Sequence, residues 1–298
     1  LPVLLLLAAG IAITAARSAR HGRVLYRAAP LLILALLYWQ TALGMRLNIG
    51  HRHILPAYPV VYILAGAATL GLARVRRPLG ALVLGAAVAA HAADSFAARP
   101  FYLSHFQPLA GGQREGWRHL VDSSFDWGQG LPDLGRWIGK LRAAGDGRPV
   151  FLSYFGADSP WARGLEVTRF GDEAFESIAE RTFPAQLKGG WYAISATQFQ
   201  QVYMDIKPPW DARLERTYRR LLADLESAGR ADAGGDPQAR ERLVGTAMDV
   251  ELLQFGRLRH FLRHRTPEAV VGGSLLVFRL TDAEVSTALF GRVPGIEP

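Results

Sequence analysis

The sequence contains no cysteine among its 298 residues. Disulfide bonds, thiol nucleophiles and cysteine-based zinc sites are therefore excluded. It also lacks the Gly-rich dinucleotide fingerprint, the P-loop, the nucleophile elbow of serine hydrolases and the His-Glu-x-x-His zinc motif. The function must therefore be sought in less familiar groups of polar residues.

Acidic residues are almost missing from the first third of the chain. Residues 1–103 contain ten arginines, no lysine and a single acid, Asp94, for a net charge of +9. The other 195 residues carry 24 basic and 25 acidic side chains, so the sequence pI of about 10.1 comes from the first third alone. A nucleic-acid partner would require a basic patch on a soluble domain, which this distribution argues against. It favours arginines that set membrane topology and contact lipid headgroups.

Four apolar segments fill this arginine-rich third, at 2–16, 28–44, 54–73 and 79–98. The last three approach the roughly 20 residues that cross the hydrocarbon core. Buried helices of a soluble protein would give the same pattern, but four in succession favour membrane spans. We therefore predict a helical transmembrane bundle over residues 1–103. Because the chain opens on Leu1 without an initiator methionine, we interpret it as a fragment that lacks its upstream part.

The loops between these segments predict the orientation. Seven arginines lie in the first and third loops, on the side that the positive-inside rule assigns to the cytoplasm (Arg17, Arg20, Arg23, Arg27, Arg74, Arg76, Arg77). The second loop and everything after the fourth segment then face outward. The expected location is a multi-pass protein of the bacterial inner membrane, with residues 104–298 periplasmic or extracellular.

Residues 104–298 alternate short apolar runs with helical patterns. The predicted strands are 117–121, 149–154, 190–195 and 274–279, and the predicted helices are 131–144, 172–181, 210–228 and 238–264. Alternation of this kind is typical of an α/β domain, here with a largely parallel sheet. The pairs Gly189–Gly190 and Gly272–Gly273 each precede a strand and are interpreted as turns.

The outward loop between the second and third segments is unusually polar. Its cationic and amide side chains could hold a phosphate or pyrophosphate, since guanidinium groups make bidentate bonds to phosphate oxygens; these are Arg46, Asn48, His51, Arg52 and His53. Pro56 and Pro59 would fix the entry to the next segment. The alternative is a solvated interfacial loop whose arginines reach headgroups. A metal site on His51 and His53 is weaker, because no acidic or cysteine ligand is nearby.

Two further polar groups have structural alternatives. His91 and Asp94 share one helix face, as a functional pair or as an ordinary helix end at the membrane interface. The basic face of the last long helix could contact anionic headgroups, although simple solvation is the expected state; it comprises Arg257, Arg259, His260, Arg263, His264 and Arg265.

A third group lies at 121–133, after a predicted strand and before a predicted helix. Asp122, Asp126, Trp127 and Gln129 suit a sugar or acceptor site, because carboxylates and amides bond hydroxyl groups while an indole stacks on a sugar ring. The alternative is structural: Ser124 or Asp126 caps the helix and Trp127 fills the core. A glycosidase pair made of Asp122 and Asp126 is a minor possibility.

Several blocks of the sequence resemble a known family. Residues 47–59 (LNIGHRHILPAYP) are similar to the N-I-G-x-R-H-x-L-P-x-Y-P segment of bacterial glycosyltransferase family 39 membrane proteins, relatives of protein O-mannosyltransferases. A second block of those proteins resembles residues 100–106, 110–112, 122–123 and 126–129, and later blocks resemble 155–156 and 193–195. The chain departs from the usual pattern at Gln107, Ser124 and Gly130.

The resemblance implies a multi-pass enzyme of the GT-C type that moves a sugar from a polyprenyl-phosphate donor to a glycan, lipid or protein acceptor outside the cytoplasm. It also implies a catalytic Asp in the first outer loop, upstream of this chain, so that no catalytic residue is assigned here. No metal or cofactor is assigned either. The alternative function is a non-enzymatic, membrane-anchored protein that binds a glycan or envelope partner.

Overall fold

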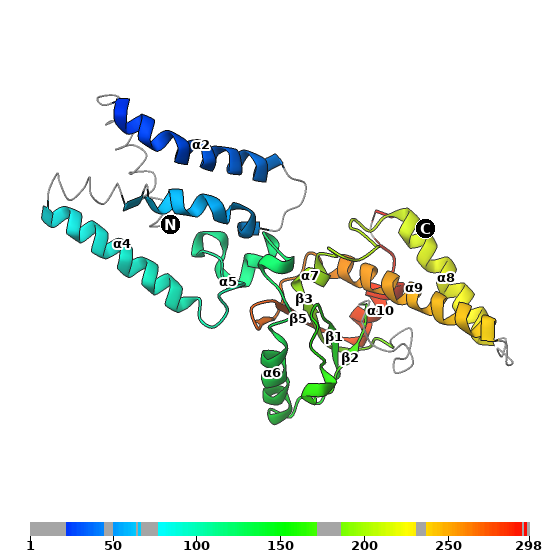
Figure 1. Ribbon diagram of the computed structural model, residues 1–298. Helices are drawn as coiled ribbons and strands as arrows, with labels where there is room; N and C mark the ends of the chain where they lie inside the picture. The colour runs from blue at the N-terminus through cyan, green and yellow to red at the C-terminus, as the bar shows by residue number, and fades with distance from the viewer. Residues whose placement is uncertain are drawn as a thin grey trace. The chain divides into compact units, whose positions relative to one another are not determined.

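The computed structural model describes residues 22–44, 50–63, 65–66, 77–171, 186–230, 237–293 and 295–296. The chain divides into two compact units, Leu1–Ser124 (unit 1) and Phe125–Pro298 (unit 2), which are described separately (Figure 1). The sequence-based boundary between residues 103 and 104 stays a prediction.

Unit 1 contains two long apolar helices, α2 (Gly22–Gly44) and α4 (Arg77–Ala97). Within them, Tyr26–Gly44 and Gly80–Ala97 are long and apolar enough to cross a membrane, and their side chains are largely exposed. The four predicted spans are not shown. Residues 2–16 lie outside the described residues, and the third segment is described only over a shorter apolar helix, Ile54–Ile63.

The described residues of unit 1 also form short helical turns: η1 (Gly50–Ala57), η2 (Pro108–Ala110), α5 (Gly112–Glu115), η3 (Gly116–Arg118) and η4 (Asp122–Ser124). The predicted strand at 117–121 is therefore wrong. Local bonds use the polar groups that a strand would need for pairing, since the His119 amide donates to Gly116 O at 3.0 Å. The buried indole of Trp117 donates to Arg114 O at 2.9 Å.

Unit 2 is built on a five-stranded mixed sheet in the order β2-β1-β3-β5-β4. The strands are β1 (Val150–Ser153), β2 (Thr168–Arg169), β3 (Gly190–Ser195), β4 (Ala269–Val271) and β5 (Leu275–Leu280). β2, β1 and β3 run parallel, whereas β5 pairs antiparallel with both β3 and β4. The prediction of a largely parallel sheet is wrong for this half, because β4 and β5 form a hairpin. Its turn uses Gly272 and Gly273 at φ +61° and +77°, which confirms that this glycine pair is a turn.

Helices cover both faces of the sheet, which explains why its strands are apolar on both sides. Helix α6 (Leu131–Ala143) packs on the face formed by Val150, Leu152 and Ala193. On the other face, Phe151 and Tyr192 stack at 4.8 Å and Phe170 contacts Phe255 of α9 (Pro237–Leu262). Alternate residues of one strand thus reach opposite layers.

The remaining helices of unit 2 surround α9. Helix α8 (Ala212–Arg230) runs along it, and α10 (Asp282–Phe290) packs against it (Figure 1). Short turns α7 (Ala196–Phe199) and η5 (Trp161–Arg163) follow β3 and β1. The predictions of α6, α8, α9, β1, β3 and β5 are confirmed, while β2, β4 and α10 were missed. The predicted helix 172–181 lies outside the described residues.

Candidate functional site

The polar loop of unit 1 is described only in part. Arg46 and Asn48 lie outside the described residues, and His51, Arg52 and His53 are described in their backbone alone, as part of η1. That backbone lies against α2 and against η4. The structure therefore brings the loop next to Asp122–Ser124, a stretch more than 60 residues later in the sequence. The role of these five residues in phosphate binding stays a prediction.

Asp122, in η4, has an unusual backbone. Its φ is +59° and its side chain is largely buried, at 8% exposure. The Ser123 hydroxyl donates to its carboxylate at 3.0 Å. A left-handed conformation costs free energy in residues other than glycine, less so in Asp than in most, and strained residues cluster at binding and catalytic sites. Asp122 is thus the residue of the predicted acceptor group that belongs to η4, the element in contact with η1.

Asp94 in α4 finds its partner outside its own helix. Its Oδ1 lies 3.4 Å from Nε2 of His105, while His91 is exposed. The interpretation of His91 and Asp94 as a functional pair is therefore not supported, and the alternative of an ordinary helix end fits better.

Asp126 is the second residue of unit 2 and is fully buried, at 0% exposure. Its Oδ1 accepts a hydrogen bond from the Gly128 amide at 3.1 Å. Burial raises its pKa to about 6, although the Gly128 amide, the Ser274 hydroxyl, the Thr197 amide and the Ser195 hydroxyl oppose that rise. Helix α6 has no side-chain cap at Gly130, so the interpretation of Asp126 or Ser124 as its cap is wrong. Asp126 instead anchors its own loop at the ends of β3 and β5.

The following three residues complete that loop. The Trp127 amide donates to Gln129 Oε1 at 2.7 Å, and Gln129 Nε2 donates to Phe125 O at 3.0 Å. The Tyr154 hydroxyl, whose pKa burial raises to about 12, donates to Gly128 O at 2.7 Å. Asp126 Oδ1 and the Gln129 side-chain amide are thus bonded within the loop itself. Trp127 does not fill the core, because it is 62% exposed.

Three sequence blocks that carry the family resemblance meet at this loop. Gly128 has φ +79°, and a Cβ placed on it would lie 2.4 Å from the Tyr154 hydroxyl and 2.9 Å from Phe155 O. The Phe155 amide donates in turn to the Ser195 hydroxyl at 3.0 Å. The block at 126–129 therefore lies against both 155–156 and 193–195, at the carboxyl ends of β1 and β3. Ligands of open α/β sheets bind at such an edge.

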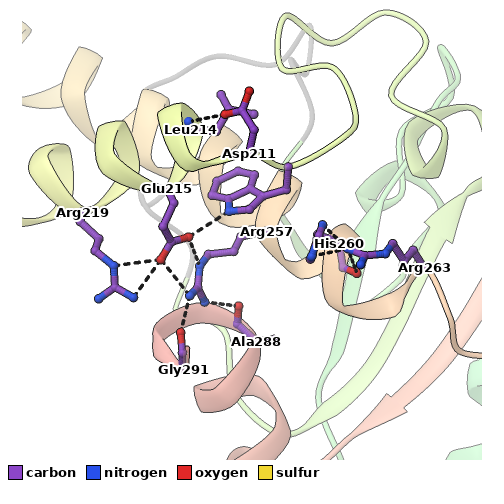
Figure 2. Close-up of polar contacts among 10 residues, drawn as sticks. Asp211, Leu214, Glu215, Arg219, Arg257, His260, Arg263, Ala288 and Gly291 are labelled. Carbon is purple, nitrogen blue, oxygen red and sulfur yellow. Dashed lines mark hydrogen bonds and ion pairs between the residues drawn. The ribbon is translucent and has the colours of Figure 1, made fainter. Parts of the chain in front are cut away.

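A buried charge network lies elsewhere in unit 2 and was not predicted (Figure 2). Arg257, 1% exposed, donates to both carboxylate oxygens of Glu215 at 2.9 and 3.1 Å and contacts the carbonyls of Ala288 and Gly291. Burial raises the pKa of Glu215, but bonds from Arg257 and Trp210 outweigh it and leave that pKa below its ordinary value. The network joins α8, α9 and α10, so its role is structural.

This network corrects the predicted basic face of the last long helix. Arg257 is buried instead of solvated, and Arg265 pairs with Glu284 at 2.7 Å. The other four basic side chains of this face are at least partly exposed and lie at the C-terminal end of α9 or just beyond it: Arg259, His260, Arg263 and His264. The sequence offered one sign that Arg257 is buried, because this residue lies among the apolar positions of α9. Its partner could not be predicted, because Glu215 is 42 residues away in the chain.

Neither a metal site nor a known relative identifies the site. Among the described residues, no group of three or more His, Asp or Glu side chains could hold a metal ion. Comparisons with models of known families, with curated proteins and with solved structures find no match for this chain.

Proposed function

We propose that this chain is part of an integral membrane glycosyltransferase that transfers a sugar from a polyprenyl-phosphate carrier to an acceptor outside the cytoplasm. The observation that carries the proposal is the contact of η1 with η4 in unit 1. η1 contains the backbone of His51, Arg52 and His53, and η4 begins at the buried Asp122, whose backbone is left-handed. These two stretches also carry two blocks of the family resemblance.

The chemistry of the loop suits the phosphate of a lipid carrier. Arginine binds phosphate oxygens through paired hydrogen bonds, and the loop follows α2, a helix long and apolar enough to reach a membrane face. In this proposal Arg46, Asn48, His51, Arg52 and His53 hold the carrier phosphate. The catalytic carboxylate is the Asp that the resemblance places in the first outer loop of such enzymes. Asp126 is not assigned this role, because its side chain is fully buried.

The proposal is tested by replacing Arg52 with alanine in the full-length protein. We expect sugar transfer, and retention of undecaprenyl phosphate by the protein in nanodiscs, to fall by roughly 30- to 160-fold, as when a phosphate contact of about 2–3 kcal/mol is lost. The matched control is Arg114→Ala, an exposed arginine of the same unit. Equal binding and transfer by the two variants would contradict the proposal.

The exposed Trp127 favours a second candidate, a membrane-anchored protein that binds a glycan without catalysis. A rigid loop that presents an indole to solvent is suited to stacking on a sugar ring. Binding of a soluble oligosaccharide that is lost in Trp127→Ala, together with full carrier binding by Arg52→Ala, would favour this candidate over the enzyme.

A further inference from the structure

A pocket of about 370 Å³ lies in unit 2 beside the buried charge network. Its lining comprises two residues of α8 and three that follow α10: Glu215, Arg219, Arg292, Val293 and Ile296. Small-molecule sites in proteins usually measure roughly 300–1,000 Å³. The pocket is therefore large enough for a small organic ligand, and the chemistry of its lining indicates the class of ligand that fits.

The carboxylate of Glu215 is fully used by the protein itself. Its Oε2 accepts hydrogen bonds from Trp210 Nε1 and from Arg257 Nε, both at 2.9 Å. Its Oε1 accepts from Arg257 Nη2 at 3.1 Å and from Arg219 Nε at 2.9 Å (Figure 2). Since a carboxylate offers about four lone-pair sites, these donors occupy all of them. Glu215 therefore holds two arginines in place and does not accept a further bond from a ligand.

The arginines of the pocket leave positive charge in excess. Arg219 bonds Glu215 with one side of its guanidinium group, and its side chain is 47% exposed. Arg292 is exposed and, within the part of the chain that the structure describes, makes no hydrogen bond and no ion pair. Among the described residues of the pocket and the network, three guanidinium groups, those of Arg219, Arg257 and Arg292, thus accompany the single carboxylate of Glu215. Two positive charges are left to attract an anion.

The remaining wall of the pocket is apolar. Val293 is buried in a hydrophobic cluster of α8 and α9, and Ile296 packs against the same cluster, which also contains Trp210, Leu214 and Tyr218. An apolar group that covers this wall would gain free energy by leaving water. A bare inorganic anion would make no use of it. The lining therefore favours a ligand that carries an anionic group on an apolar body.

We propose that this pocket binds a small organic anion. Arg219 and Arg292 hold its carboxylate or phosphate group, and its apolar body packs on Val293 and Ile296. Arginine forms paired, charge-assisted hydrogen bonds with either kind of anion. Because the pocket joins α8 to the segment after α10, a bound anion holds these two segments together. The inference goes beyond the proposed function, since the site lies in unit 2 and uses none of the residues proposed to bind the carrier phosphate.

Hydrogen exchange of the full chain in phosphatidylcholine nanodiscs tests the proposal, since these lipids carry no net charge. Exchange of residues 212–222 and 284–293 is measured with hexanoate, hexyl phosphate, hexanol or inorganic phosphate, each at ~5 mM, and α6 is the internal control. A ligand that binds the folded site slows local opening by one plus the ratio of its concentration to its Kd. We expect hexanoate, hexyl phosphate or both to slow exchange at least about threefold, which corresponds to a Kd of about 2.5 mM or tighter. Hexanol and inorganic phosphate should slow it by less than about 1.5-fold.

Arg292→Gln is the decisive variant. Its side chain makes no bond within the described residues, so the exchange of the unliganded protein should stay unchanged. We expect this variant to reduce the slowing by the anion to less than about 1.5-fold, whereas Arg216→Gln, at an exposed residue of α8 outside the pocket, should keep the full effect. The anion that slows exchange more identifies the bound group as a carboxylate or a phosphate. Slowing by neither anion, equal slowing by hexanol or by inorganic phosphate, or full slowing in Arg292→Gln would overturn the proposal.

Discussion

Replacing Asp126 by asparagine gives the sharpest test of how the loop at 126–129 is held. The Asp126 carboxyl is fully buried and its pKa rises from an ordinary 3.8 to about 6. A carboxyl group whose pKa is raised on folding favours the protonated form in the folded state. Its contribution to stability is therefore greatest below the unfolded pKa, and it decreases as pH rises through 3.8 toward 6, with no further change above.

The size of the effect follows from the two pKa values. The interval from 3.8 to about 6 corresponds to a cost of about 3 kcal/mol for folding with a charged Asp126 at pH 7.5. Asparagine has the same shape, retains an oxygen that accepts from the Gly128 amide, and offers an NH₂ group to the Ser195 and Ser274 hydroxyls. We therefore expect Asp126→Asn to be more stable than the wild type at pH 7.5 by up to about 3 kcal/mol, with little difference at pH 4.

Hydrogen exchange of the segments 125–131 and 190–195 measures this free energy within unit 2 itself. Protection of the wild type should fall between pH 4 and pH 7.5 after correction for the intrinsic exchange rate, and that of Asp126→Asn should stay level. Asp133→Asn, at a partly exposed residue paired with Arg136, is the control and should keep the wild-type profile. A variant that is less stable than the wild type at pH 7.5 would refute the reasoning, because it would mean that the charged form is well solvated in place.

Two further variants test the packing of unit 2 by thermal and urea unfolding. Arg257→Met should lower the free energy of unfolding by about 3–5 kcal/mol, because it leaves the Glu215 carboxylate buried without its partner. Arg219 also bonds this carboxylate, but its side chain is 47% exposed, so Arg219→Gln should cost less than about 1 kcal/mol. Similar losses in the two variants would contradict a structural role for the buried pair. Gly128→Ala should cost about 3 kcal/mol or more because its methyl group meets the Tyr154 hydroxyl, while Gly145→Ala, at the similar φ of +81° but with open space around it, should cost about 1 kcal/mol. Equal costs would show that backbone strain alone decides both.

The elements that could be predicted are those whose signal is local and long. Helices α6, α8 and α9 have apolar positions at helical spacing, and β1, β3 and β5 are apolar runs of strand length. The strand predicted at 117–121 failed because Trp117 and His119 make turn bonds within five residues, which an apolar pattern does not reveal. β2 was missed because it has only two residues and exists through its pairing with β1.

The candidate site was found in part for the same reason. The polar loop and the block at 122–129 stand out by composition, so both were identified as candidates. The sequence left open whether Asp126 and Gln129 serve a ligand or the loop, because this depends on burial and on polar groups supplied by distant segments. The contact between η1 and η4 joins residues that are far apart in the chain, and spacing does not predict it.

The sequence by itself determined that the chain has two regions of different composition. Charge and hydropathy separate an arginine-rich apolar third from a balanced α/β region, because each property is a sum over local residues. Tertiary structure alone decided which polar residues are structural and which are exposed. Asp126 and Arg257 are charged side chains that the fold buries and bonds, while Trp127 is a large apolar ring that it leaves in solvent. These outcomes reverse the usual preference of each residue type, and they depend on partners supplied by distant segments.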